Sequence, residues 1–261
     1  MEKNVLTEVE RQRIRELVEI YYDCQAFRIA AFNRLRTVGI VEGVHPERLL
    51  QLEKEIRDYI EKTISGIPIY ENFLKQVKGI GPILAGALLA YLDPAKAEHA
   101  SSFWRYMGFH VVDGKAPRFE KGKKAGYSKR LHVLGWKIGD SFIKQRTPKY
   151  REIYDLAKNR ENEKLGFPVD FNGNPGPIAT PEKCKFYQEC KKIQEAKAKR
   201  LGRKPKPPPC AKHIHFRALR KAIKQFLADL WVEWRTLMGL PVSDPYAIAI
   251  LKHQPTTSQK L

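Results

Sequence analysis

The chain has 261 residues, 43% of them hydrophobic and 10% aromatic, which is the composition of a folded protein with a core of its own. No apolar run reaches the roughly 18 residues that a membrane span needs, and the charged start MEKNVLTEVERQ is unlike a signal peptide; both exclude a membrane or secreted protein and predict a cytoplasmic location. The net charge of +19 indicates an acidic partner.

The first part of the chain predicts two long helices joined by a short loop. Residues 7–38 keep apolar residues at a helical period, and Thr7 and Glu10 have the spacing of a capping box. Gly39 marks the loop, and residues 46–64 repeat the amphipathic pattern. The two helices predict an antiparallel hairpin, suited to an arm, to a surface for forming a homodimer, or to half of a bundle.

A glycine-rich turn follows this helix pair. A short helix over residues 69–77 leads into a Gly-Ile-Gly turn, and Pro82 opens a second, very apolar helix, in which Ala85, Gly86 and Ala87 permit close packing. A helix that opens on such a turn presents free N–H groups and the positive end of its dipole, which suit a phosphate. The alternative is an ordinary tight connection between helices. The residues expected to contact nucleic acid here are Lys78, Gly79, Ile80 and Gly81.

Further helices are predicted downstream of the turn. A short helix covers residues 101–109, and an amphipathic helix covers residues 128–145. Residues 148–165 alternate in charge, which is typical of a solvent-facing helix. Residues 211–238 carry enough apolar side chains to pack on the main core. The predicted fold class is therefore all-α.

The chain has one clear candidate for a domain boundary. Residues 166–182 are rich in Gly, Pro and Asn and are too long for a simple turn. We therefore expect a helical hairpin over residues 1–65, a helix-hairpin-helix domain over residues 66–165, and a basic segment with the final helix over residues 166–261.

The positive charge is concentrated in two blocks. Residues 1–65 carry 11 Lys and Arg against 12 Asp and Glu, whereas residues 115–164 carry 15 against 6 and residues 183–224 carry 15 against 2. This segregation indicates a polyanion, and nucleic acid is favoured over a membrane surface because no basic amphipathic helix with large exposed apolar residues is evident. The side chains expected to contact the sugar-phosphate backbone are Lys121, Lys123, Lys124, Lys129, Arg130, Arg200, Arg203, Lys204 and Lys206.

The cysteines suggest a metal site. Three of the four fall within 27 residues, and a histidine follows the last of them by three positions. Three thiolates and an imidazole match the ligands of tetrahedral zinc. We expect a closed, structural Zn²⁺ site, with His215 as a competing fourth ligand and with buried thiols or a redox pair as the alternatives. The predicted ligands are Cys184, Cys190, Cys210 and His213.

No recognisable catalytic set is present. The sequence lacks a P-loop, an HExxH and a GxSxG motif, and the acidic residues nearest the basic blocks, Asp93, Asp113 and Asp140, are scattered. Lone aspartates of this kind usually cap helices or turns. We therefore name no catalytic residue.

Three segments, in chain order, resemble the C-terminal domain of the bridge-RNA-guided, DEDD-type insertion-sequence transposases. That family shows a GIGPxxA helix-hairpin-helix, then a Gly with a following Ser-Gly, then an SKxGN segment. The similarity spans residues 45–145. The matching positions are Gly79 to Ala85, Gly108, Asp113-Gly114 and Ser128-Lys129.

Two departures from the family pattern bear on what the resemblance implies. The family's nuclease domain has no counterpart in residues 1–65, and its nucleophilic serine falls at Asp113. The cysteine-bearing C-terminal segment is an addition, which is similar to archaeal transposase-like proteins of comparable length. The resemblance therefore implies a nucleic-acid-binding module related to the transposase of a mobile element, without recombinase activity.

The expected function is that of a non-catalytic DNA-binding protein. Contacts to phosphate carry little sequence information, so binding is expected to be largely sequence-tolerant. The alternatives are a metal-dependent nuclease or recombinase that uses Asp113, and a binder of structured RNA.

Overall fold

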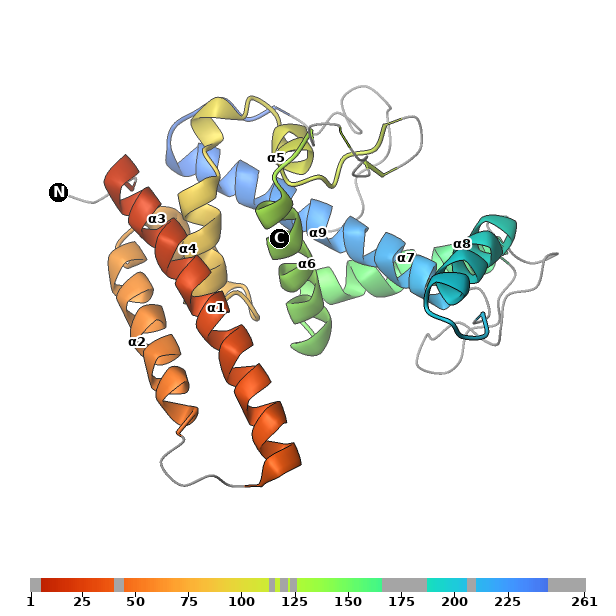
Figure 1. The fold of residues 1–261 in the computed structure, drawn as a ribbon. Coiled ribbons are helices and arrows are strands. Elements are labelled where there is room, and N and C mark those ends of the chain that lie inside the picture. Colours follow the sequence, from red (N-terminus) through yellow and green to blue (C-terminus); the bar gives the residue numbers. More distant parts are fainter. Residues whose placement is uncertain are drawn as a thin grey trace. The chain divides into compact units, whose positions relative to one another are not determined.

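The computed structural model describes most of the chain, and Figure 1 shows its helices as a ribbon. The described residues are 6–39, 45–112, 116–117, 122, 126–165, 187–205 and 210–243, without the side chains of residues 163–165 and 210–213. Within these ranges the chain is helical and contains no β-strand. The predicted all-α class is confirmed.

The long helices begin and end within a residue or two of the predicted positions, as the following bounds show. The α-helices are α1 (Glu8–Val38), α2 (Glu47–Ile64), α3 (Pro68–Asn72), α4 (Pro82–Tyr91), α5 (Ala100–Tyr106), α6 (Lys129–Lys144), α7 (Pro148–Leu165), α8 (Tyr187–Arg200) and α9 (Cys210–Leu237). Two short 3₁₀-helices are η1 (Leu74–Gln76) and η2 (Pro94–Lys96).

The chain forms two compact units. Unit 1 comprises residues 1–134 and 227–261, and unit 2 comprises residues 135–226. Helices α6 and α9 contribute residues to both units, because the unit boundaries fall inside them. The three predicted segments divide the chain in order along its length, whereas unit 1 combines segments that are far apart in sequence.

The core of unit 1 is built where α1, α2 and α4 pack against one another. Helix α1 opens on the predicted capping box, in which the Glu10 N–H donates to Thr7 Oγ1 at 3.3 Å and the Thr7 N–H donates to Glu10 Oε2 at 2.9 Å. Ile14 of α1 and Ile60 of α2 are fully buried. They meet at Gly86 of α4, where an added Cβ would lie 2.5 Å from Ile60 Cγ2 and 3.4 Å from Ile14 Cγ2. The predicted close packing through small residues is thus confirmed at Gly86.

Two arginines of α1 cap the C-terminal end of α4. Arg11 Nη1 donates to the carbonyls of Leu89 and Leu92 at 2.8 and 2.7 Å. Arg15 donates to the Ala90 carbonyl from Nε at 2.9 Å and from Nη2 at 2.6 Å. The last carbonyls of a helix have no partner within it and carry its negative dipole end, so guanidinium groups both satisfy and neutralise them. This contact attaches α1 to the apolar helix that follows the glycine turn.

Within unit 1, the C-terminal end of α9 packs against the segment around η2. Trp231 Nε1 donates to the Ala97 carbonyl at 2.7 Å, and Arg235 Nη1 donates to the carbonyls of Pro94 and Ala97 at 2.7 and 3.1 Å. The Trp231 side chain is fully buried. The prediction that the final helix packs on the main core is confirmed.

Unit 2 has an aromatic core of its own. The rings of Phe142 on α6 and Tyr150 on α7 stack at a centroid distance of 4.6 Å, and Phe226 of α9 packs edge-on against both. Helix α7 also buries Tyr154 and Ala157 on the same side. The expectation that α7 faces solvent was therefore wrong, because its aromatic face is covered by α6 and α9 despite the alternating charges around it.

Candidate functional site

The glycine turn lies between η1 and α4. The segment predicted as one helix over residues 69–77 is broken at Phe73 into α3 and η1. Gly79 then adopts φ = +94°, a left-handed conformation that side chains other than glycine rarely take. The Ile80 side chain is only 6% exposed, which anchors the turn in the core and leaves its backbone as the part that can contact a ligand.

The first turn of α4 presents backbone N–H groups. Gly81 is its N-cap residue, Pro82 is its first helical residue, and no side chain caps this end. A Cβ placed on Gly81 would meet no atom within 4 Å, so the space beside the turn is open. Lys78 is exposed next to it. The local geometry is that of a helix N-terminus open to an anion, beside a cation.

The segments around Gly108 and Ser128 lie side by side. Gly108 has φ = +72°, and a Cβ there would lie 2.4 Å from the Tyr127 ring, so only glycine allows this ring to cover the backbone. The Ser128 N–H donates to the Tyr106 carbonyl at 2.9 Å, and His132 Nδ1 lies 2.9 Å from the Met107 carbonyl oxygen. These contacts position the start of α6.

The start of α6 carries two of the predicted basic contacts. Lys129 and Arg130 are both exposed, and Arg130 Nε lies 3.3 Å from Glu19 Oε1 of α1. Arg130 is thus partly neutralised by unit 1 itself. Asp113 and three further predicted contacts, Lys121, Lys123 and Lys124, lie outside the described residues.

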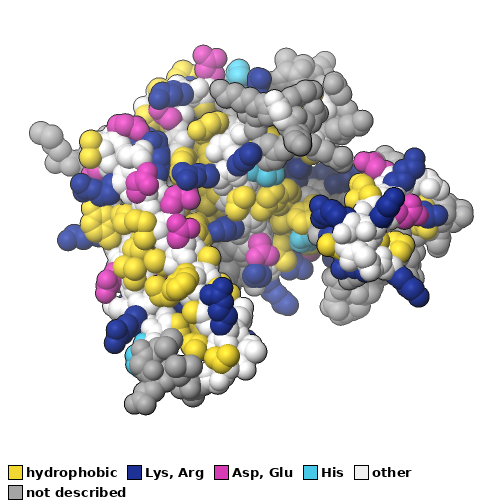
Figure 2. All heavy atoms as spheres, in the orientation of Figure 1, with side chains coloured by type: hydrophobic (Ala, Val, Ile, Leu, Met, Phe, Trp, Pro, Cys, Tyr) yellow, Lys and Arg dark blue, Asp and Glu magenta, His cyan; other side chains and the backbone are white. Residues whose placement is uncertain are grey.

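The remaining predicted contacts belong to unit 2. Arg200 ends α8, and Arg203 and Lys204 follow it, all of them exposed. Lys206 lies outside the described residues. Figure 2 shows Lys and Arg side chains around α8. Together these residues make the C-terminal end of α8 basic, and all of them belong to unit 2.

Helix α9 carries a basic face that the prediction did not single out. It comprises Arg217, Arg220, Lys221 and Lys224, and we refer to it as the α9 basic face. The spacing of three and four residues places these side chains on one side of the helix. The same spacing is present in the sequence and could have identified this face. Burial lowers the pKa of Lys224, and the neighbouring charge of Arg220 lowers it further. Arg217 Nη1 lies 2.8 Å from Glu161 Oε2 of α7.

Two aromatic side chains border the α9 basic face. The rings of Trp136 on α6 and Phe216 on α9 meet edge to face at 5.2 Å between centroids. The Arg220 guanidinium lies over the Trp136 ring, 5.7 Å from its centroid. Phe216 is 38% exposed, whereas Phe142 and Phe226 of the same unit are fully buried. The surface of unit 2 therefore combines clustered cations with the exposed Phe216 ring and the half-buried Trp136.

Most of the predicted metal site lies beyond the described side chains. Cys184 is outside the described residues, and Cys210 and His213 lie one turn apart at the start of α9, where side chains are not described. Cys190, in the first turn of α8, is only 3% exposed. No group of three or more metal-ligating residues occurs among the side chains that are described. His215 Nδ1 lies 2.8 Å from the Tyr154 hydroxyl of α7, which occupies one ring nitrogen of the competing ligand.

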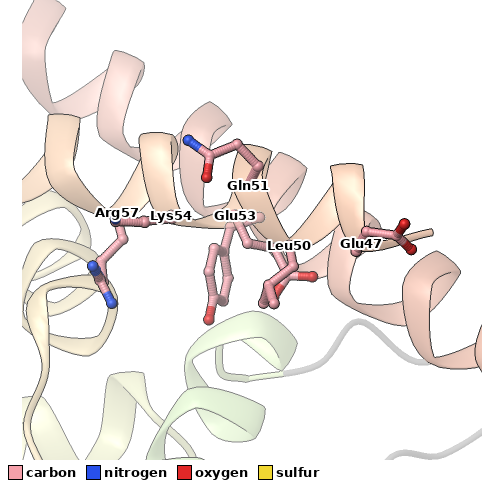
Figure 3. A pocket seen from close by; sticks show the side chains of 7 residues that line it. Glu47, Leu50, Gln51, Glu53, Lys54 and Arg57 are labelled. Carbon is pink, nitrogen blue, oxygen red and sulfur yellow. The ribbon is translucent and has the colours of Figure 1, made fainter. Parts of the chain in front are cut away.

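A shallow pocket of about 310 Å³ lies beside α2, and Figure 3 shows its lining. It lies next to a two-bond ion pair between Arg28 and Glu53, whose Nη2–Oε2 distance is 3.1 Å. Its lining mixes acidic, basic and apolar side chains, and such a mixture does not favour any one class of ligand. The residues are Tyr21, Glu47, Leu50, Gln51, Glu53, Lys54 and Arg57.

None of the helices in the described part of the chain is both long and apolar enough to cross a membrane. Comparison of the chain with protein-family models, with curated proteins and with solved structures finds no match.

Proposed function

We propose that the protein binds DNA without cleaving it, largely without regard to sequence, through contacts to phosphate. The observation that carries this proposal is the α9 basic face. Four cations share one side of a helix, and Lys221 among them is exposed. Their combined positive potential favours a polyanion, because phosphates placed along this side of the helix are attracted to several cations at once.

The glycine turn supplies a second contact in the proposal. We interpret α3, η1, the turn and α4 as a helix-hairpin-helix that grips one phosphate with the backbone after Gly79 and with Lys78. The left-handed Gly79, the open space beside Gly81 and the absence of a side-chain cap on α4 support this interpretation. Contacts of this kind set position on the backbone and carry no base information.

The proposal includes a relationship to transposases. It rests on the resemblance of the three motif segments, two of which adjoin where Tyr127 packs onto Gly108. The non-catalytic character can be tested with plasmid DNA and Mg²⁺ or Mn²⁺. We expect no nicking, and cleavage that is abolished by Asp113→Ala would instead establish the nuclease alternative.

Binding is tested by titrating labelled duplex DNA at several salt concentrations. We expect affinity to fall by at least about a hundredfold between 50 and 200 mM salt, because each neutralised phosphate releases counterions. Lys221→Gln should weaken binding and reduce the salt slope by about one. The matched control is Lys62→Gln, which removes an exposed lysine from the near-neutral α2.

A salt-independent affinity, or an equal effect of Lys62→Gln and Lys221→Gln, would contradict the proposal. Structured RNA is added as a competitor in the same titration. Displacement of duplex DNA at equal or lower concentration of RNA would favour the RNA-binding alternative.

We further propose a structural zinc ion bound by Cys184, Cys190, Cys210 and His213. Three thiolates and one imidazole fit a closed tetrahedral site, which joins chain segments and supplies no catalytic water. The burial of Cys190 supports a structural role. The contact with Tyr154 leaves Nε2 of His215 available, so His215 stays the competing fourth ligand.

A second copy of the chain is the proposed partner of α1. Its exposed apolar residues Ile20 and Phe27 lie on one side of the helix, and Figure 2 shows hydrophobic side chains gathered over α1 and α2. Glu16 and Arg34 lie on the same side, and residue 25 is the midpoint between them in the sequence. An antiparallel two-fold contact centred there would place each Glu16 opposite Arg34 of the second copy.

A further inference from the structure

We infer that unit 2 carries a stacking site for unpaired bases, formed by Phe216 and Trp136 and flanked by the α9 basic face. The ligand class is single-stranded nucleic acid, with bases on the rings and phosphates on the cations. The inference deepens the proposed function and rests on it.

The geometry puts the two kinds of contact side by side. Phe216, Arg220 and Lys224 are spaced by four residues and form one row along α9, with Arg217 and Lys221 in the neighbouring row. Trp136 of α6 meets this row at Phe216 and Arg220. A strand that follows the row therefore passes from an aromatic ring to cations within two helical turns.

The aromatic pair is separate from the core of unit 2. Phe142, Tyr150 and Phe226 already form a buried cluster, and Phe216 lies outside it with 38% of its surface exposed. An exposed phenylalanine beside clustered cations costs hydration free energy that a stacked base would recover. The Arg220 guanidinium beside Trp136 adds a third group to this surface, because bases stack on guanidinium planes as well as on rings.

The aromatic surface selects single strands over duplexes. In a duplex the base faces are covered by their neighbours, so a ring on a protein surface reaches them only after unstacking. Cations alone would bind both forms through phosphate. If this is a stacking site, loss of the Phe216 ring weakens the binding of single strands and not that of duplexes. A general basic patch would show no such difference.

The experiment compares a 20-nucleotide oligo-dT with a 20-base-pair duplex, using the full chain at one salt concentration. Phe216→Leu keeps an apolar side chain and removes the ring, and we expect it to weaken oligo-dT binding by about 5- to 150-fold while leaving duplex affinity within twofold. Phe216→Tyr should restore binding to the oligo-dT. The matched control is Tyr59→Leu, which removes an exposed ring from α2 and should change neither affinity.

The duplex affinity of Phe216→Leu reports that the variant is folded. Equal weakening of both ligands, or no weakening of oligo-dT, would overturn the stacking site while leaving phosphate binding in place. Failure of the wild-type chain to bind either ligand would instead overturn the proposed function itself, and the inference with it.

Discussion

Gly86 is the residue on which the packing of α1, α2 and α4 depends. An added methyl group would lie 2.5 Å from the γ2 methyl of Ile60, a β-branched side chain with little rotamer freedom. Alanine is the better helix former by about 1 kcal/mol, so propensity alone would favour the replacement. Overpacking costs about 1–3 kcal/mol and acts in the opposite direction.

We predict that Gly86→Ala lowers the free energy of unfolding and the thermal midpoint. The measurement is thermal and urea unfolding followed by circular dichroism. Gly126→Ala is the matched control, because Gly126 is exposed outside the helices, has no positive φ and has open space around its Cβ position, and we expect a change within about 0.5 kcal/mol. A Gly86→Ala protein at least as stable as the wild type would show that Ile60 can move aside.

The burial of a polar residue is difficult to predict from the type of residue alone. Arg11 lies on the core side of α1 and is 7% exposed, although arginine is seldom buried. The reason is its pair of hydrogen bonds to carbonyls at the end of α4, on a segment far along the chain. No pattern within α1 itself indicates that partner.

At the scale of elements, the zinc proposal concerns α8 and α9. We predict close to one equivalent of zinc in protein purified without a polyhistidine tag. Cys190→Ser should lose the zinc and lower the thermal midpoint, because a closed site contributes directly to folding. Cys24→Ser is the matched control, since Cys24 belongs to α1, and it should retain the metal. Zinc-free wild-type protein, or equal loss in both variants, would remove the site from consideration.

The long elements were predictable because their signals are local. The capping box at Thr7 and the helical period of α1 depend only on neighbouring residues, and both are observed. The aromatic face of α7 was missed because its charges alternate around Tyr150 and Tyr154, while the partners that bury these rings belong to α6 and α9. The break at Phe73 was missed because the sequence there carries neither glycine nor proline.

At the scale of the whole molecule, the proposed partnership of two copies through α1 makes a prediction. We expect a dimer by light scattering coupled to size-exclusion chromatography, and a monomer for Phe27→Asp. The control Val133→Asp alters an exposed apolar residue of α6 and should leave the dimer intact. Glu16→Arg should weaken the dimer and addition of Arg34→Glu should restore it, since the swapped pair recovers opposite charges. A wild-type monomer across the concentration range would refute the proposed contact.

The sequence by itself determined the all-α class, the positions of the long helices and the separation of a near-neutral first part from two basic blocks. These properties depend on residues close together in the chain, so they can be counted directly. Only the tertiary structure decided that arginines of α1 cap α4, that α9 contributes to both units, and that Trp136 meets Phe216 beside the α9 basic face. Such contacts join residues distant in sequence, and the path of the folded chain alone brings them together.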